Sequence, residues 1–519
     1  MTRQAGVHLA PQSSFVLRGG RANCVIGSVS LIAEGISSPV RPVLRGRFGA
    51  VAAAHPLAAA AGQEMLVSGG SAVDASIAAQ AVLCVIMPDA CGLGGDLLAL
   101  VHAPGAALQA INGTGCAPFR STHAADDGPH SITVPGIVDA WCTLSRQYGQ
   151  VPLARALEPA VRLARAGTRV SVAFAATLAM QRERLARGAA RRWVLFDARA
   201  GDLVRQPELC ALLERVGVEG AAAFYRGAAA RHIARAVEAL GGTLNEEDLA
   251  AHETILGAPV TTQWGAVTLS TQPPMSQGIL LNMSVQALCR LGGVAAPLQD
   301  HAAVEFTNAA FAYRDDVARG AALLAHELSI DLTRASNRKG PRSYLHTAGV
   351  ACVDAGGMVI SSLVSVFDDF GSCVFVPDLG MLLNNRAGGF TAGANSAAPG
   401  KRPVHTLAPA MLNTPQGVLA LATPGADGQV QTLLQVLIGL NGGMDLAAAI
   451  ARPRWRSENG ALLIEQSHAG VDRLLALGHR IIRCADGDAR FGAVVSAGFI
   501  DAEPIAAADW RRETAAGVV

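Results

Sequence analysis

Residues 347–385 read TAGVACVDAGGMVISSLVSVFDDFGSCVFVPDLGMLLNN, and this stretch decides the fold. Two apolar runs, 348–353 and 358–367, are joined by a short glycine turn. That pattern predicts a buried β-hairpin, and the apolar runs within 371–383 predict further strand. The last third of the chain is therefore expected to be rich in sheet.

The segment just before this hairpin has a different character. Residues 335–346 read ASNRKGPRSYLH, with four basic residues (one a histidine), a glycine and a proline, and with little periodicity. Such a segment is typical of a surface loop. Thr347 therefore stands where a predicted loop meets a predicted buried strand.

The first two thirds of the chain are predicted to be rich in helix. AVAAAHPLAAAAGQEMLVSGG (50–70) predicts a short strand and then a helix. SAVDASIAAQAVLCVIMP (71–88) predicts a second helix capped by Ser71. CGLGGD (91–96) predicts a turn before a buried strand, and residues 135–330 are predicted to be mainly helical. Two sheets covered by helices is the architecture that these elements favour.

The composition excludes several classes of protein. The 519 residues include 42 basic and 41 acidic ones, a net charge of +1, so no field of one sign favours nucleic acid or a membrane surface. No run of about twenty apolar residues predicts a transmembrane helix. The ten cysteines show no CxxC spacing, which favours buried thiols in a reducing compartment over zinc or redox motifs. We expect a cytoplasmic protein, with the periplasm as the weaker alternative.

The N-terminus is predicted to be an extension, residues 1–46, without clear periodicity. Arg18 and Arg21 precede a modest apolar run, 24–33, as in a secretory signal. Because glycine and serine residues interrupt that run, we favour an extension over a signal.

Thr347 has two interpretations. As an internal residue it is an ordinary strand-edge threonine. If the peptide bond before it breaks, its new α-amino group, with a pKa of about 8, can accept the proton of its own hydroxyl. One residue then supplies both nucleophile and base, and the same hydroxyl can make the cut by attacking the carbonyl of His346. Loop and strand pattern alone do not decide between the two.

Several motifs, taken in order, resemble one family. HPLAAAAGQEMLVSGGSAVDASIAA, GLGGD, VPGIVDAW, PPMSQGI, the 347–385 stretch, GKRPVHTLAPAML and ATPGADGQ together are similar to the γ-glutamyltranspeptidase family of N-terminal-nucleophile hydrolases. The resemblance runs from about residue 49 to about residue 456. It implies an α+β fold, a four-layer αββα sandwich, and autocleavage between His346 and Thr347. One folded unit would then consist of a large-fragment part, 47–346, and a small-fragment part, 347–519.

The resemblance also implies roles for individual residues. Thr347 falls on the nucleophile, seven positions before Asp354. Ser365 falls where a hydroxyl bonds the threonine's amino group or hydroxyl. Gly425 and Ala426 fall on the pair whose backbone N–H groups form the oxyanion hole, a type of donor worth about 3 kcal/mol in the transition state.

The residues expected to bind substrate depart from the glutathione-cleaving members. Thr114 stands in place of the arginine that holds a glutamyl carboxylate, and Gly389 stands in place of the acid that holds its amino group. The paired serines become His405 and Thr406. The pattern is closer to the oxamate-amidohydrolase-like branch, and we expect Arg386, His405 and Asp427 to build a different pocket, with Arg386 suited to a small carboxylate.

Purely structural roles remain alternatives for Arg386 and His405. Arg386 can be a surface ion pair, and His405 a hydrogen-bonded structural histidine. GLGGD lacks a phosphate-loop ending, so we interpret it as close backbone packing near the active cleft.

The expected function is that of a self-processing N-terminal threonine amidohydrolase or acyltransferase. It would cleave a γ-glutamyl or small acyl amide through an acyl-threonine intermediate. The partners expected are a small-molecule amide and the chain's own second fragment, forming a heterodimer that can itself pair, with no nucleic acid or membrane. No cofactor or metal is expected, since Asp368–Asp369 alone make a poor cation cage. The alternative is an uncleaved, inactive relative that binds a ligand.

Overall fold

The computed structural model describes residues 40–519, apart from 292–295, 339 and 341–346. Two seven-stranded antiparallel sheets form its centre. Sheet I has the order β21 (Ala515–Val518), β2 (Gly49–Ala53), β10 (Ala348–Asp354), β11 (Val359–Ser365), β3 (Asp96–His102), β4 (Gln109–Gly113) and β7 (Ile255–Gly257). Sheet II has the order β1 (Leu44–Arg45), β20 (Glu503–Ala508), β19 (Val495–Ile500), β15 (Gly417–Ala422), β14 (Ala410–Thr414), β9 (Val267–Thr271) and β8 (Val260–Trp264).

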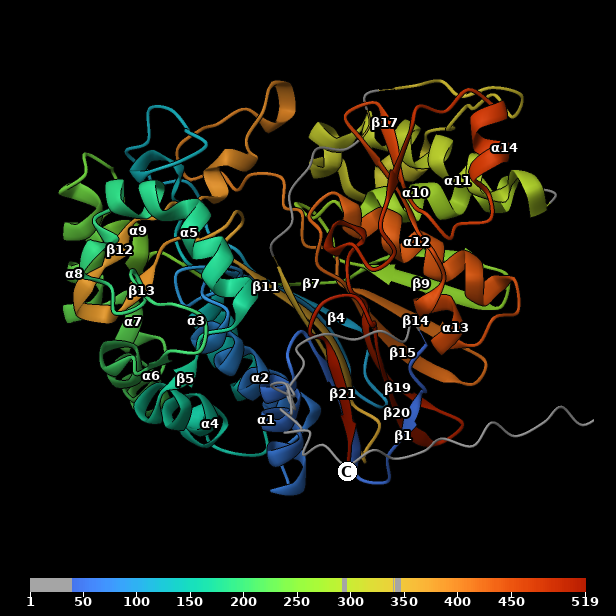
Figure 1. Ribbon diagram of the computed structural model, residues 1–519. Coiled ribbons are helices and arrows are strands. Elements are labelled where there is room, and N and C mark those ends of the chain that lie inside the picture. Colours follow the sequence, from blue (N-terminus) through green and yellow to red (C-terminus); the bar gives the residue numbers. More distant parts are fainter. Residues whose placement is uncertain (1–39, 292–295, 339, 341–346) are drawn as a thin grey trace, which may run out of the picture. The chain divides into compact units, whose positions relative to one another are not determined.

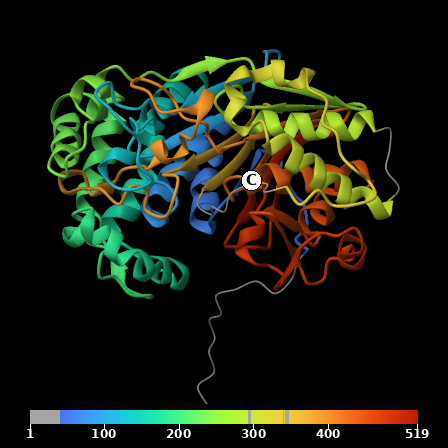
Figure 2. The same cartoon turned by 90° about the horizontal axis from the view of Figure 1, so that it is seen from above.

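Helices cover the outer face of each sheet (Figures 1 and 2). The layer on the side of sheet I consists of α1 (Pro56–Val67), α2 (Ala72–Ile86), α3 (Ile137–Tyr148), α4 (Leu153–Ala166), α5 (Val172–Arg187), α6 (Pro207–Glu219), α7 (Ala222–Tyr225), α8 (Gly227–Glu238) and α9 (Glu246–Ala250). The layer on the side of sheet II consists of α10 (Gly278–Arg290), α11 (Ala296–Phe311), α12 (Gly428–Asn441), α13 (Leu446–Ala451) and α14 (Val471–Ala476). This is the predicted four-layer αββα sandwich.

The central strand β10 of sheet I is apolar on both faces. In β10, Val350 and Cys352 pack against the helices, whereas Ala351 and Val353 face sheet II. Successive side chains of a strand point to opposite faces, so a strand buried on both sides reads as one continuous apolar run. Much of the inter-sheet core is alanine, at positions 50, 52, 110, 351, 420, 422, 497 and 506. These small side chains account for part of the alanine-rich composition.

The strongest local predictions are confirmed. The strand and helix of 50–70 are β2 and α1, and the helix of 71–88 is α2. Ser71 and Asp74 cap α2 reciprocally, each side chain accepting a hydrogen bond from the other's backbone N–H. The 347–385 stretch opens with the predicted hairpin, β10 paired with β11.

The prediction that residues 135–330 are mainly helical is wrong for 255–271, which form β7, β8 and β9. Along β8, Val260 and Thr262 are buried whereas Thr261 and Gln263 are exposed, the two-residue period of a half-buried strand. Gly265 at φ +59° begins the two-residue turn between β8 and β9. The same alternation can be seen in the sequence, but it lies between long segments with helical periodicity and was not recognised as strand.

Smaller differences concern the lengths of elements. Helix α11 ends at Phe311, and a separate 3₁₀ segment follows at Arg314–Ala325. Within 371–383 the strands are only β12 (Phe375–Val376) and β13 (Met381–Leu382). The remaining strands form two small sheets, β5 (Thr168–Arg169) with β6 (Leu203–Val204), and β16 (Trp455–Glu458) with β17 (Ala461–Glu465) and β18 (Ile481–Cys484).

The two predicted fragments are interleaved in both sheets. In sheet I, β10 and β11 of the small-fragment part pair with β2 and β3 of the large-fragment part. Strand β1, at the end of the predicted extension, pairs with β20. The other residues assigned to the extension, 1–39, lie outside the described part of the chain. No helix within the described residues is long and apolar enough to cross a membrane.

Candidate active site around Thr347

Thr347 lies at the entry to β10, a central strand of sheet I. Its neighbours in the sheet fix its position, because β10 pairs with β2 on one side and with β11 on the other. In the pairing of β10 with β11, Ala348 lies opposite Val364. The same register extended by one residue places Thr347 opposite Ser365. Ser365 in turn pairs with Asp96 at the start of β3. Three neighbouring strands therefore bring Thr347, Ser365 and Asp96 to one end of the sheet.

All three side chains share one face of the sheet. Directly opposed residues of antiparallel strands point to the same side, and alternate residues of one strand do as well. Leu363 and Leu98, two positions from Ser365 and Asp96, belong to the core between the sheets. Thr347 and its two neighbours therefore face the inter-sheet space. Thr347 is 2% exposed, so the hydroxyl lies in an interior setting.

Ser365 ends β11 and begins a turn. Its Oγ accepts a hydrogen bond from the backbone N–H of Phe367 at 2.9 Å. Phe367 has φ +88°, a conformation that non-glycine residues rarely adopt, so the turn is locally strained. This hydrogen bond fixes the Ser365 hydroxyl at the end of β11.

Asp96 is the central residue of a buried ionic cluster. Its Oδ2 accepts hydrogen bonds from Arg386 Nε at 2.9 Å and from His405 Nε2 at 3.2 Å. Asp96 and Arg386 are fully buried and His405 is 2% exposed. Arg386 is therefore not the surface ion pair left open by the sequence. Asp96, the last residue of GLGGD, was missed as a functional residue, although its place at the end of a glycine-rich turn was a usable signal.

The electrostatics of this cluster fix its protonation. Burial by itself would raise the pKa of Asp96, but the His405 hydrogen bond and the Arg386 charge hold that pKa below its usual value. Burial and the Arg386 charge lower the pKa of His405 to about 4. His405 Nδ1 accepts from the Leu407 N–H at 3.1 Å, which leaves the proton on Nε2, facing Asp96. The cluster thus holds a carboxylate, a neutral imidazole and a guanidinium.

Arg386 has unused hydrogen-bonding capacity. Its Nη1 and Nη2, together with Asp96 Oδ1, have no hydrogen-bond partner among the described residues. The guanidinium lies over the ring of Phe367, 4.4 Å from its centroid. Unsatisfied buried donors are unfavourable, and those on a charged group are more so. Two guanidinium nitrogens in this state are suited to a planar carboxylate ligand.

The loop carrying Gly425 and Ala426 joins β15 to the N-terminus of α12. Both residues have positive φ, +122° and +48°. Gln277 Nε2 donates to the carbonyls of Ala426 at 2.8 Å and Thr406 at 2.6 Å, which fixes this loop to the 405–406 segment. Neither the Gly425 nor the Ala426 amide donates a hydrogen bond to another described residue. Two unused amides beside the positive end of a helix dipole can stabilise an oxyanion.

Gln277 is a second functional residue that sequence reasoning missed. It lies in PPMSQGI, one of the motifs that carried the family resemblance, but no role was assigned to it. Its side chain is fully buried. Its place in that motif, at the start of α10, was the available signal.

The other predicted substrate residues are buried but differ in their surroundings. Asp427 is fully buried and pairs with Arg314 Nε at 3.3 Å. Thr114 Oγ1 donates to Asn112 at 2.7 Å. A Cβ at Gly389 would stand 2.9 Å from the carbonyl oxygen of Val404, so an acidic side chain at that position needs a backbone shift. No hydrogen bond among the described residues joins Thr114 or Gly389 to the Asp96 cluster. His346 lies outside the described residues.

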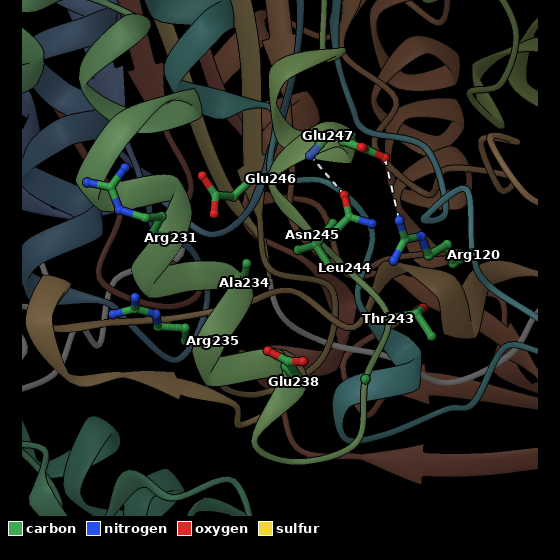
Figure 3. A pocket seen from close by; sticks show the side chains of 11 residues that line it. Arg120, Arg231, Ala234, Arg235, Glu238, Thr243, Leu244, Asn245, Glu246 and Glu247 are labelled. Carbon is green, nitrogen blue, oxygen red and sulfur yellow. Dashed lines mark hydrogen bonds and ion pairs between the residues drawn. The ribbon is translucent and has the colours of Figure 1, made fainter.

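A surface pocket elsewhere has a different character (Figure 3). It encloses about 550 Å³ between α8 and the start of α9. Arg120 and Glu247 form an ion pair at 3.8 Å across it, and the Asn245 side chain caps α9. Its lining includes none of the predicted site residues, and its charges serve helix capping and solvated ion pairs, so we do not assign the catalytic centre to it.

The fold and this arrangement define the class of the protein. A four-layer αββα sandwich with a threonine at the end of a central strand is the arrangement of the N-terminal-nucleophile amide hydrolases. The family model described as gamma-glutamyltranspeptidase matches residues 58–519. The chain belongs to the gamma-glutamyltranspeptidase family.

Individual relatives agree with this assignment. The chain is 31% identical to the oxamate amidohydrolase proenzyme of Klebsiella pneumoniae, over 84% of this chain and 92% of that protein. It is 28% identical to the acylase ACY 1 proenzyme of a Pseudomonas strain, over 84% and 88%. The solved cephalosporin acylase of Bacillus halodurans superposes with a TM-score of 0.82 at 26% identity, over 95% and 99%. The chain is therefore an enzyme of the amide-hydrolysing type, and the inactive binding protein is not favoured.

Proposed function

We propose that this chain is a self-processing amidohydrolase in which Thr347 is the nucleophile, and that its substrate is a small amide carrying a carboxylate. The observation that carries the proposal is the Arg386 guanidinium. It is fully buried, it is oriented by Asp96, and it has two nitrogens without a hydrogen-bond partner among the described residues. Asp96 begins β3, which pairs with β11. Strand β11 in turn pairs with β10, the strand that begins directly after Thr347. A carboxylate on Arg386 would therefore be bound beside the nucleophile.

Maturation begins with attack of the Thr347 hydroxyl on the carbonyl carbon of His346. The resulting ester is hydrolysed by water, which leaves fragments 1–346 and 347–519. The new α-amine of Thr347, with an ordinary pKa of about 8, then acts as the base for its own hydroxyl. The two fragments remain one heterodimer because strands of both fragments pair with each other in both sheets.

Catalysis repeats this chemistry on the substrate. Thr347 Oγ1 attacks the amide carbon, and its proton passes to the α-amine. The N–H groups of Gly425 and Ala426 stabilise the tetrahedral oxyanion. The protonated amine returns the proton to the leaving amine or ammonia, which leaves an acyl-Thr347 ester. Water resolves this ester and restores the hydroxyl.

Three features support the proposed substrate class. Thr114 and Gly389 replace the charged pair that would hold a free glutamyl head, so a γ-glutamyl substrate loses its two ionic contacts. Arg386 provides one cationic contact, which matches a compact acyl group with a single carboxylate. The 31% identity to an oxamate amidohydrolase over 92% of that protein points to the same class, an amide whose carbonyl carbon is bonded directly to a carboxylate.

The processing test uses two substitutions at Thr347. Thr347→Ala should give a single chain of 53.3 kDa on a denaturing gel, without activity, whereas the wild type gives two fragments. Thr347→Ser keeps a hydroxyl and should still cleave, but more slowly. Continued cleavage between 346 and 347 in the alanine variant would rule out Thr347 as the agent.

The substrate test measures product release from the matured enzyme. Oxamate, glutamine, γ-glutamyl anilide and glutaryl amides form the panel. Oxamate should give the highest kcat/KM. A γ-glutamyl compound turned over faster than oxamate would contradict the assignment of substrate class while leaving the Thr347 mechanism intact.

A further inference from the structure

Three side chains outside the catalytic cluster converge in the layer that covers sheet II. His301 and Glu305 are one helical turn apart on α11, and His479 lies between α14 and β18. One potential ligand atom from each residue lies within 4.8 Å of the other two. All three residues are buried, with exposures of 0%, 1% and 7%.

The hydrogen bonds of His301 define which nitrogen faces the cluster. His301 Nε2 lies 2.8 Å from the backbone carbonyl oxygen of Asp331, an acceptor, so this nitrogen carries the proton. His301 Nδ1 therefore presents a lone pair, and it lies 2.8 Å from His479 Nε2. An imidazole whose far N–H is held by a backbone carbonyl has the outer-shell arrangement of metal-bound histidines.

The hydrogen bond between His301 and His479 leaves the hydrogen-bonding capacity of Glu305 partly unused. Glu305 Oε1 accepts from the Ser336 N–H at 3.2 Å, but Oε2 is buried and has no hydrogen-bond partner among the described residues. A buried carboxylate oxygen in this state is costly unless it is paired or coordinates a cation.

We propose that His301, Glu305 and His479 bind a divalent transition-metal ion, with Zn²⁺ the best match. Two imidazoles and a carboxylate form one of the ligand sets of protein zinc, and a water molecule completes the tetrahedron. Zn–N bonds of about 2.0–2.1 Å require the two nitrogens to be about 3.3 Å apart, so the pair opens by about 0.5 Å on binding. Glu305 and His479 also line a small cavity of about 10 Å³, roughly the space of one water-sized sphere.

The site would have a structural role in the chain that leads to Thr347. Segment 331–338 lies against the cluster: Asp331 accepts from His301 and Ser336 donates to Glu305. Ala335 N–H donates to the Leu477 carbonyl at 2.7 Å. Metal binding would therefore fasten this segment to α11 and to the turn before β18. The inference goes beyond the proposed function, because it uses none of the catalytic residues.

The first experiment measures bound metal in the full-length protein. Wild type produced in zinc-supplemented medium should carry about one Zn²⁺ per chain by mass spectrometry of the metal. Glu305→Gln, which keeps the size of the side chain, and His479→Ala should each lower that content at least tenfold. His123→Ala, at an exposed histidine, is the matched control and should keep the metal.

Stripped protein gives a second readout. Added Co²⁺ should produce the visible absorption of a four-coordinate ion in wild type but not in Glu305→Gln, and Zn²⁺ should raise the melting temperature of wild type alone by about 2 °C or more. Metal removal should speed tryptic cleavage after the exposed residues Arg334 and Arg338, with cleavage after Arg199 unchanged. If His479→Ala does not fold, the metal content and Co²⁺ absorption of Glu305→Gln test the proposal by themselves. Wild type without metal and without a Zn²⁺-dependent shift, or equal metal in Glu305→Gln, overturns the proposal.

Discussion

Arg386 is the residue on which the proposed substrate class depends. Substituting Arg386 alone would leave Asp96 as an unpaired buried charge, which is strongly destabilising. The paired variant Arg386→Gln with Asp96→Asn avoids this, because an asparagine oxygen still accepts from His405 Nε2. Removing two charge-assisted hydrogen bonds worth about 2–4 kcal/mol should lower kcat/KM for oxamate about 30- to 1,000-fold.

The matched control for this variant is another buried arginine–aspartate pair. Arg454 Nη2 lies 2.6 Å from Asp509 Oδ2, and both residues are fully buried. Arg454→Gln with Asp509→Asn should lower the melting temperature without changing KM for oxamate. Both variants should still be processed, since autocleavage needs no substrate carboxylate. An unchanged KM in the Arg386 pair would remove the carboxylate-binding role.

His405 makes the stability of the enzyme sensitive to acid. Its folded-state pKa is about 4, whereas an unfolded histidine titrates near 6.5. The unfolded chain therefore binds a proton first as the pH falls. The stabilisation from the neutral imidazole is complete above about pH 6.5 and is lost progressively down to pH 4. The loss between pH 7.5 and 5 should be about 2 kcal/mol for this one group.

Urea unfolding of the single-chain Thr347→Ala protein at pH 7.5 and 5 measures this loss. In that background His405→Gln, which keeps a donor for Asp96, should reduce the pH dependence by about 2 kcal/mol. His123→Gln, at an exposed position, should keep the full dependence. Equal slopes in all three proteins would show that His405 does not titrate as its surroundings indicate.

At the scale of single elements, α2 depends on its cap. Asp74 Oδ2 accepts from the backbone N–H groups of Ser71 at 2.9 Å and Gln150 at 2.7 Å, so one carboxylate joins the helix start to the loop after α3. Asp74→Ala should destabilise the protein by about 2 kcal/mol or more, because it leaves buried donors unsatisfied. Asn245→Ala removes the equivalent cap from the short helix α9 and should cost about 1 kcal/mol. Melting temperatures of the two variants measure the difference, and an equal drop in both would contradict it.

The same elements explain what the sequence could predict. The α2 cap and the β10–β11 hairpin depend on residues a few positions apart, so their signals are local. The Asp96 cluster is not local, since Asp96 lies 290 positions from Arg386 and 309 from His405. The sequence indicated Arg386 and His405 through a family resemblance, but their shared carboxylate required the structure. Likewise, His301 and His479 are 178 positions apart, and no cysteine spacing or short motif indicated the proposed metal site.

At the scale of the whole molecule, the position of the proposed cut relative to the sheets determines the fate of the fragments. Among the described residues, five strand pairings join residues before 347 to residues after it: β10–β2, β11–β3, β2–β21, β14–β9 and β1–β20. Separating the fragments would expose the edges of both sheets and the core between them. The proposed cut therefore creates a new N-terminus at Thr347 while both fragments stay paired in the two sheets.

We therefore expect the processed fragments to behave as one protein. A tag on the C-terminus should recover both fragments in equal amounts, and they should co-elute on gel filtration until denaturant unfolds the sheets in one cooperative step. The Thr347→Ala single chain is the control, and it should unfold at a similar or slightly higher denaturant concentration because the intact link limits the unfolded chain. Fragments that separate under native conditions would mean that the interleaved sheets do not hold the mature enzyme together. The catalytic amine of Thr347 would then lose the support of its neighbour β2, because that strand belongs to the other fragment.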